Sequence, residues 1–342
     1  MLTFRRVALL VVIAFLVATL PVFANGAQEG GEDGSLRVGV IYLTLEHPYY
    51  QAHQRWTQHW AEEEGIELIE LDGQTDAATM ASQIENLIAQ QVDGIIYCLI
   101  DPNSAVGDIQ AAQEAGIPVV TFAIKHDEAA DAPFVGIPEF EAGKLGGEEA
   151  GRLFNERFSG EQARVVTLTM PTTPAILNRS DGFFAGFQEV VPNAELVATL
   201  DGEGLREAAF DVTEDLIQST PDVNVFYGAN GDMGLGALAA LESAGRGTIQ
   251  DQLIVSHDGS EPEVIEIVDP ESALKLAVAN RPRELAKGTI DTLLEIINGE
   301  RSMTNTDEIM INAAVLENDI GALQEFISTQ YFSDLDLSEQ AE

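Results

Sequence analysis

Cysteine, lysine and positive charge are all scarce in this chain. Its 342 residues include a single cysteine, Cys98, which excludes a disulfide within the chain and a metal site built from several cysteines. Only 17 lysines and arginines stand against 57 aspartates and glutamates, so the net charge is −40. A surface of this sign repels phosphate backbones, and the composition therefore argues against a nucleic-acid partner.

Sequence motifs of the common enzyme classes are also missing. No two histidines are spaced as a His-x-x-x-His zinc pair, because His47, His53 and His59 recur every six residues, about 120° apart on a helix. The chain has no Gly-x-Ser-x-Gly, Gly-x-Gly-x-x-Gly or phosphate-loop motif. The side chains of the contiguous triplet Ser256–Asp258 diverge along a strand and cannot form a proton relay. We expect no catalytic residue, no metal site and no cofactor.

The N-terminus has the pattern of an export signal. Two arginines precede an apolar run, Val7–Val22, whose length of about 16 residues is short for the ~20 that a membrane-spanning helix needs. Small residues then mark a cleavage site after Ala24. We predict a signal peptide over residues 1–24 and a flexible linker over residues 25–35, so the mature protein is exported.

Apolar segments alternate with helix-like segments twice along the remaining chain. Strands are predicted in the first half at Leu36–Leu43, Ile66–Leu71, Gly94–Ile100, Ile117–Phe122 and Pro133–Ile137. Strands are predicted in the second half at Arg164–Met170, Leu196–Leu200, Val223–Tyr227, Leu253–His257 and Leu274–Ala279. Continuous apolar runs are typical of parallel sheets covered on both faces. The alternation predicts an α/β fold of two doubly wound parallel-sheet lobes.

Polar and aromatic residues follow the predicted strands in both halves. Ligands of open parallel sheets bind outside the carboxyl ends of the strands, so residues after strands are the candidates. The candidate binding residues are His47, Tyr49, Tyr50, Arg179, Asn230, Asp258 and Asn280. Aromatic rings stack on the C–H faces of sugars, while carboxylates, amides and arginine hydrogen-bond to hydroxyls. This set predicts a cleft for a neutral polyhydroxylated ligand.

At these positions the chain resembles the periplasmic sugar-binding proteins of ABC importers, the ribose- and galactose-binding or type I periplasmic binding protein family. The resemblance spans Leu36 to Asn312 and rests on motifs that occur in order. These motifs are Val38–Val40, Pro48–Tyr50, Gln83–Ile96, Ala115–Thr121, Asn178–Phe183, Ala229–Met233, Leu235–Ala237, His257–Gly259 and Asn298–Glu300.

The resemblance implies two lobes that close on the ligand and are joined by a three-segment hinge. The crossings would lie near Val135–Pro138, Ala279–Pro282 and Ile309–Asn312. The lobes would be residues 36–137 plus 281–310, and residues 138–280 plus 311–342. The implied location is the periplasm, and the implied partner is the permease of an ABC transporter.

The resemblance also assigns roles to the seven candidates. Tyr49 and Tyr50 match the aromatic pair that packs on the sugar, and His47 matches the polar residue before it. Arg179 matches the arginine that clamps ring hydroxyls. The three remaining candidates match polar residues that follow strands or lie at a crossing; they are Asn230, Asp258 and Asn280.

Two departures from the ribose-binding pattern make ribose itself a doubtful ligand. Ala123 and Ile124 stand where ribose-binding proteins commonly have an Asp-Arg pair, for which Lys125 or Glu46 could compensate. An aromatic residue is also missing from the loop near Gly204.

Several alternatives remain open at this stage. Tyr49 could be a core residue, and Arg179 could pair with Asp181 or Asp211 on the surface. Asp232 is expected to cap the helix that follows it. A sugar receptor for a chemotaxis or two-component sensor would look the same in sequence. A lactose-repressor-type regulator would need a basic DNA-binding segment in place of the apolar leader.

We predict that the melting temperature rises substantially with NaCl, and similarly with KCl. Without the two signal-peptide arginines, 15 basic residues face 57 acidic ones, so the mature chain carries −42 and its folded surface repels itself. Raising salt from ~0.01 M to ~1 M shortens the Debye length from about 30 Å to about 3 Å. A steep rise would favour adaptation to a saline surrounding, whereas a flat profile would leave an ordinary acidic secreted protein.

Overall fold

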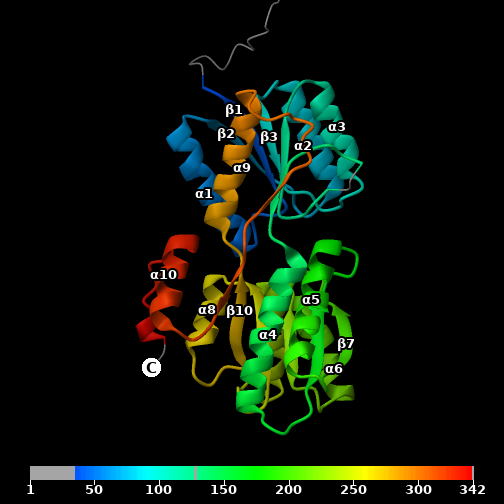
Figure 1. Cartoon of the computed structure of the whole chain (residues 1–342), viewed down its shortest axis with the longest axis vertical. Coiled ribbons are helices and arrows are strands. Elements are labelled where there is room, and N and C mark those ends of the chain that lie inside the picture. The colour runs from blue at the N-terminus through cyan, green and yellow to red at the C-terminus, as the bar shows by residue number, and fades with distance from the viewer. Residues whose placement is uncertain (1–34, 127–128, 341–342) are drawn as a thin grey trace, which may run out of the picture.

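Two six-stranded sheets with their covering helices organise the protein, and Figure 1 shows them one above the other. This computed structural model describes residues 35–126 and 129–340. The predicted signal peptide, and all of the predicted linker except its last residue, lie outside the described residues. We call the sheet that contains the first strand, together with its helices, lobe 1, and the other sheet with its helices lobe 2.

Lobe 1 has a wholly parallel sheet with the strand order β11-β5-β4-β3-β1-β2. Its strands are β1 (Arg37–Tyr42), β2 (Glu67–Asp72), β3 (Gly94–Tyr97), β4 (Val119–Phe122), β5 (Phe134–Gly136) and β11 (Glu308–Met310). Its helices are α1 (Pro48–Glu64), α2 (Ala77–Ala89), α3 (Ala105–Glu114) and α9 (Pro282–Ile297).

Lobe 2 has the strand order β12-β10-β9-β8-β6-β7, in which β12 pairs antiparallel to β10. Its strands are β6 (Arg164–Thr169), β7 (Glu195–Asp201), β8 (Val225–Gly228), β9 (Leu253–Asp258), β10 (Leu274–Ala279) and β12 (Ala314–Leu316). Its helices are α4 (Glu139–Arg157), α5 (Pro174–Val190), α6 (Arg206–Ser219), α7 (Gly231–Ser243), α8 (Glu261–Val268), α10 (Ile320–Tyr331) and the 3-10 helix Leu337–Glu339. None of the described helices is both long and apolar enough to cross a membrane.

The burial of the strands explains why their sequences lack polar alternation. Every residue of β3, β4, β8, β9 and β10 is buried, whereas the edge strands β2 and β7 are partly exposed. A central parallel strand is covered on both faces, so most of the side chains on both of its faces are apolar. The predicted α/β fold of two parallel-sheet lobes is confirmed.

Three short segments connect the lobes. They run from β5 to α4, from β10 to α9 and from β11 to β12, and Figure 1 shows them in the middle of the molecule. No strand or helix is predicted from sequence after Gly299, yet β11, β12 and α10 all follow it. The two strands have three residues each, and they form by pairing with β5 and β10 rather than by any periodicity of their own.

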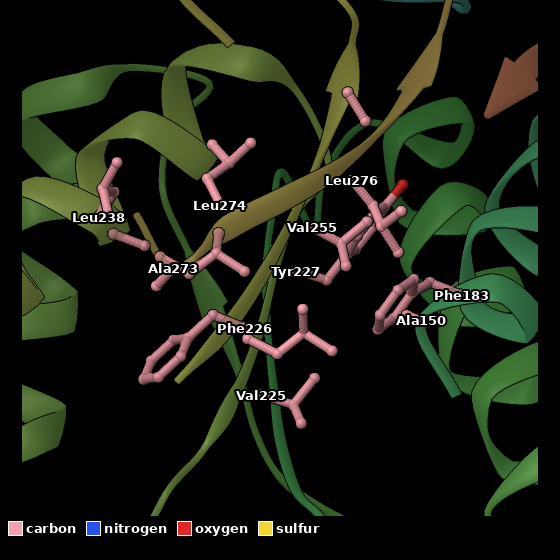
Figure 2. Close-up of a cluster of buried hydrophobic side chains, with 14 of the residues drawn as sticks. Ala150, Phe183, Val225, Phe226, Tyr227, Leu238, Val255, Ala273, Leu274 and Leu276 are labelled. Carbon is pink, nitrogen blue, oxygen red and sulfur yellow. The ribbon is translucent and has the colours of Figure 1, made fainter. Parts of the chain in front are cut away.

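The core of lobe 2 fixes the helix that carries one of the candidate residues. Figure 2 shows the rings of Tyr227 from β8 and Phe183 from α5 among the buried side chains. These two rings stack with their centroids 4.2 Å apart and their planes 6° from parallel. The Tyr227 hydroxyl also hydrogen-bonds to Nδ1 of His257 at 3.0 Å. This packing holds α5, and with it Arg179, against the sheet.

Glycines let α4 and α5 approach each other backbone to backbone. A Cβ atom on Gly147 of α4 would lie 2.0 Å from the carbonyl oxygen of Phe183, and one on Gly182 of α5 would lie 2.1 Å from that of Phe140. Neither carbonyl is a flexible group that can move aside. The contact therefore requires glycine at both positions.

We predict that Gly147→Ala destabilises the protein by about 1–3 kcal/mol or more, because the added methyl group must push the two helices apart. The control is Gly107→Ala in α3, where the new Cβ meets only open space. There alanine should raise stability by about 0.5–1 kcal/mol, since glycine is the poorer helix former. Urea unfolding of both variants measures the difference, and equal effects would contradict the close helix contact.

Candidate ligand-binding site

A cavity of about 340 Å³ lies between the two lobes, within the range of ~300–1,000 Å³ for small-molecule sites. The structure brings all seven predicted residues to its wall: His47, Tyr49, Tyr50, Arg179, Asn230, Asp258 and Asn280. The other lining residues of lobe 1 are Leu43, Thr44, Glu46, Thr75, Ile100, Ala123 and Ile124. The other lining residues of lobe 2 are Met170, Thr173, Ile176, Glu203, Gly204, Leu205 and Asp232.

The start of α1 presents His47 to the cavity in a defined orientation. His47 is the N-cap of α1, and its Nδ1 accepts a hydrogen bond from the backbone N–H of Tyr49 at 3.2 Å. A neutral ring that accepts at Nδ1 carries its proton on Nε2. That Nε2 lies 3.6 Å from an oxygen of Asp232 and 3.6 Å from an oxygen of Asp258, both in lobe 2. His47 therefore directs a donor across the cleft.

Tyr49 and Tyr50 form an aromatic corner beside His47. Their rings meet edge to face with centroids 5.0 Å apart, and both side chains are almost fully buried. The Tyr50 hydroxyl accepts a hydrogen bond from the thiol of Cys98 at 3.7 Å. Burial raises the pKa of both tyrosines well above the usual value, so both hydroxyls are neutral. Tyr49 could be a core residue or a cavity residue by its sequence. The structure places it in both positions, because it packs in the core of lobe 1 and also lines the cavity.

Arg179 is held by a buried ion pair. Its Nε and Nη2 donate to the two oxygens of Glu139 at 2.5 and 3.1 Å, and its Nη1 donates to the carbonyl oxygen of Ala229 at 3.1 Å. The alternative of a surface pair with Asp181 or Asp211 is wrong, because the side chain is buried at the cavity wall. Three of the five N–H groups are used, which leaves two for a ligand.

Asp258 is held by three other residues of lobe 2. Its carboxylate accepts hydrogen bonds from the backbone N–H of Gly231 at 3.1 Å and from the side-chain amide of Asn280 at 2.8 Å, and it lies 3.8 Å from Nη1 of Arg179. Burial raises the pKa of this carboxyl, and nearby His47 and Arg179 oppose the shift. The two hydrogen bonds leave lone pairs on both oxygens that can accept from a ligand.

The backbone of Asp258 is strained. Its φ of +106° lies in the region that side chains rarely adopt. Conformations of this kind cost about 1–3 kcal/mol and persist only where the surrounding structure holds them, often at functional sites.

Asn230, and not Asp232, caps α7. The Asn230 side chain accepts from the backbone N–H of Met233 at 2.8 Å and donates to the carbonyl oxygen of Gly204 at 2.9 Å. The expectation that Asp232 caps this helix is wrong, because Asp232 lies inside the first turn and lines the cavity. Asn230 precedes the first residue with helical geometry, which is the position a cap must occupy.

Sequence reasoning missed Glu139 as a site residue. It is the first residue of α4, directly after the crossing that ends at Pro138, and its side chain is only 11% exposed. A lone acidic residue after a proline gives no signal of its partner, which is 40 positions away in the sequence. Of the two suggested compensating residues, Glu46 lines the cavity, whereas Lys125 instead pairs with Glu308 at 2.6 Å.

The described residues show no cluster of three or more histidine, cysteine or acidic side chains that could hold a metal ion. The cavity wall has more acidic than basic side chains. Its one arginine, Arg179, stands against four acidic lining residues, which are Glu46, Glu203, Asp232 and Asp258. The arrangement can offer hydrogen bonds to hydroxyls from both lobes and an aromatic surface from one.

We predict that Glu139→Ala destabilises the protein by about 3–5 kcal/mol, because it leaves the Arg179 charge buried without its partner. Glu141→Ala is the control, since Glu141 lies in the same first turn of α4 but is exposed. It should change stability by less than about 0.5 kcal/mol. Chemical denaturation of the ligand-free protein measures both, and a small effect of Glu139→Ala would mean that Arg179 finds another partner.

Comparison with known proteins shows the family of the chain. The sequence profile of the family described as "Periplasmic binding protein domain" matches residues 38–301. The ribose import binding protein of Bacillus subtilis is 26% identical over 282 residues, which is 82% of this chain and 88% of that protein. An ABC transporter periplasmic-binding protein of Escherichia coli is 27% identical over 293 residues, covering 83% of this chain and 86% of that protein.

Solved structures share the fold at lower identity. An ABC transporter solute-binding protein of Actinobacillus succinogenes, solved with bound D-allose, has a TM-score of 0.76 at 23% identity and covers 85% of this chain and 100% of its own. A solute-binding protein of Bacillus halodurans, solved with bound myo-inositol, has a TM-score of 0.76 at 22% identity, covering 89% and 99%. Because the profile match spans most of both lobes, the chain belongs to the periplasmic binding protein family.

Proposed function

We propose that this protein is an extracytoplasmic solute-binding protein that captures a neutral sugar or polyol between its lobes and delivers it to an ABC transporter. The observation that carries the proposal is the single cavity wall to which both lobes contribute, with aromatic rings on one side and a charged hydrogen-bonding cluster on the other. Relatives in the same family are named for the import or binding of ribose, D-apiose and xylitol, which supports a small polyhydroxylated ligand.

Each of the seven wall residues then has a role. Tyr49 and Tyr50 stack on the C–H face of the ligand, and His47 donates to a hydroxyl through Nε2. The remaining four form the lobe 2 clamp for hydroxyls, with Arg179 donating, Asp258 accepting, and the amides of Asn230 and Asn280 doing either. A hydroxyl both donates and accepts, so it can satisfy His47 and Asp258 together.

Ligand capture works by shifting a population. Contacts from both lobes exist together only when the lobes are closed, so the ligand stabilises the closed form. A permease that binds this closed form couples capture to uptake. We propose no catalytic step, because the groups at the wall are arranged to hold hydroxyls rather than to break bonds.

The remaining proposals concern location and boundaries. The apolar leader would be cleaved after Ala24, which releases the protein to the periplasm. The lobe boundaries would be those stated above, 36–137 plus 281–310 and 138–280 plus 311–342. None of the observations favours the chemoreceptor, sensor or DNA-binding alternatives.

A ligand screen tests the proposal directly. The mature protein is assayed by thermal shift, and then by calorimetry, against ribose, D-allose, D-galactose, xylitol and myo-inositol. Ligand binding to the folded state raises the melting temperature by mass action. We expect at least one to bind, and ribose to bind less tightly than another member of the panel because Ala123 and Ile124 line the cavity. If no sugar or polyol raises the melting temperature, the proposed function is wrong.

We predict that Tyr49→Leu weakens binding of the best ligand by about 1–3 kcal/mol, because stacking area is lost while apolar bulk remains. Tyr49→Phe keeps the ring and is the matched control, with affinity close to that of the unmodified protein. Calorimetry measures both. Equal affinity of the leucine and phenylalanine variants would make Tyr49 a core residue only.

A further inference from the structure

The chain ends in a segment that touches both lobes. Residues 317–340, which we call the C-terminal strap, contain α10 and the 3-10 helix. Figure 1 shows α10 beside α8 and below α1. Its apolar side is anchored in lobe 2, because Leu323, Ile327 and Leu337 are fully buried members of the lobe 2 core.

The C-terminal end of α10 is capped by side chains of lobe 1. The last carbonyl groups of a helix have no partner within the helix and need one elsewhere. Trp56 of α1 donates its ring N–H to the carbonyl oxygen of Gln330 at 2.9 Å, and Arg55 donates to that of Tyr331 at 2.9 Å. A cation at this end also interacts favourably with the helix dipole.

The strap in turn caps a helix of lobe 1. The side-chain oxygen of Gln330 accepts the backbone N–H of Arg283 at 3.2 Å, in the first turn of α9. The side-chain amide of Gln330 donates to Glu284 at 3.0 Å. The two lobes thus satisfy each other's helix ends, and Gln330 is buried between them.

An aromatic contact closes the junction. Phe332 ends α10 with a φ of +57°, and its ring lies 4.3 Å from the Trp56 ring between centroids. The Arg55 guanidinium lies 5.2 Å over the Phe332 ring, and that of Arg283 lies 5.0 Å over Trp56. Trp60 stacks on Trp56, with the ring centroids 5.7 Å apart.

The strap also reaches the ligand cavity. The Tyr331 hydroxyl donates to the backbone carbonyl of Asp258 at 3.0 Å, and Tyr331 is buried. Asp258 is the strained residue whose carboxylate lines the cavity and lies 3.6 Å from His47. Consecutive residues of one helix end therefore contact the cavity wall of lobe 2 and the helices of lobe 1.

We propose that the C-terminal strap is a fourth connection between the lobes, and that it sets the balance between their open and closed arrangements. Its contacts with lobe 1 occur in an arrangement where His47 faces Asp232 and Asp258 across the cleft. Rotation of lobe 1 away from lobe 2 breaks those contacts, so the strap favours closure. Apparent affinity scales with the fraction of molecules in the binding-competent form. For this readout the inference rests on the proposed sugar-binding function.

The test loosens the strap from each side in turn. Gln330→Ala with Phe332→Ala removes the strap's side-chain contacts with lobe 1, and Trp56→Phe removes one hydrogen bond from the lobe 1 side. Glu325→Ala, exposed on α10, is the control. Thermal unfolding first confirms that each variant is folded.

Small-angle X-ray scattering of the ligand-free proteins then measures their radius of gyration, and calorimetry measures affinity for the best ligand of the screen. We expect a larger radius for both strap variants. Losing one or two hydrogen bonds should weaken binding about three- to tenfold. The Glu325→Ala variant should keep the radius of gyration and the affinity of the unmodified protein.

Intrinsic fluorescence gives an independent signal, because the only two tryptophans of the chain, Trp56 and Trp60, both lie at this junction. Loosening the strap in the Gln330→Ala, Phe332→Ala variant should shift the ligand-free emission to longer wavelength.

Folded strap variants with an unchanged radius of gyration and unchanged affinity would overturn the inference and leave the strap as a part of lobe 2 alone. The scattering measurement needs no ligand, so it distinguishes this outcome from a failure of the proposed sugar binding.

Discussion

The buried pair of Arg179 and Glu139 is the interaction on which the binding cavity depends. Neither charge is tolerable alone in the interior, so the two must fold together. Glu139 starts α4 immediately after the first crossing between the lobes, and Asn280, which holds Asp258, lies on the second crossing. The side chains of Arg179 and Asp258 are thus held by residues at the crossings between the lobes.

The two lobes contribute to the cavity in different ways. Lobe 1 offers side chains at the start of α1, where the N-cap role of His47 fixes its orientation and the tyrosines stand on a packed core. Lobe 2 offers a network in which Arg179 and Asp258 are already held by protein partners before any ligand arrives. Such a network is organised in advance, so binding need not order it. The C-terminal strap adds contacts between the two lobes outside the cavity lining, through Gln330 and Phe332.

The two rounds of alternating strands and helices are predictable from the sequence, because buried parallel strands have continuous apolar runs such as Ile95–Tyr97. Residues that follow these strands gather at one edge, so all seven candidates reach the cavity. Contacts between residues far apart in the sequence leave no local pattern that predicts them. The residues around Glu139 do not indicate that it pairs with Arg179. The three-residue strands β11 and β12 form only by pairing with neighbouring strands. The helix α10 does carry local signals, since Asp319 caps it and its buried residues Leu323, Ile327 and Tyr331 lie four positions apart, but the prediction does not use them.

The two sides of the cavity differ in how much of the fold depends on them, and this difference affects which residues can change during evolution. The lobe 1 residues Glu46, Thr75, Ala123 and Ile124 line the cavity from loops between its strands and helices, and none belongs to the Arg179 network. Substitutions of the exposed Glu46 can change which ligand fits without removing the partner of a buried charge, whereas Ile124 also packs in the lobe 1 core. Substitutions of Arg179 or Asp258 in the lobe 2 wall instead disturb a buried network of charges. New specificities in descendants of this chain should therefore accumulate on one side of the cleft.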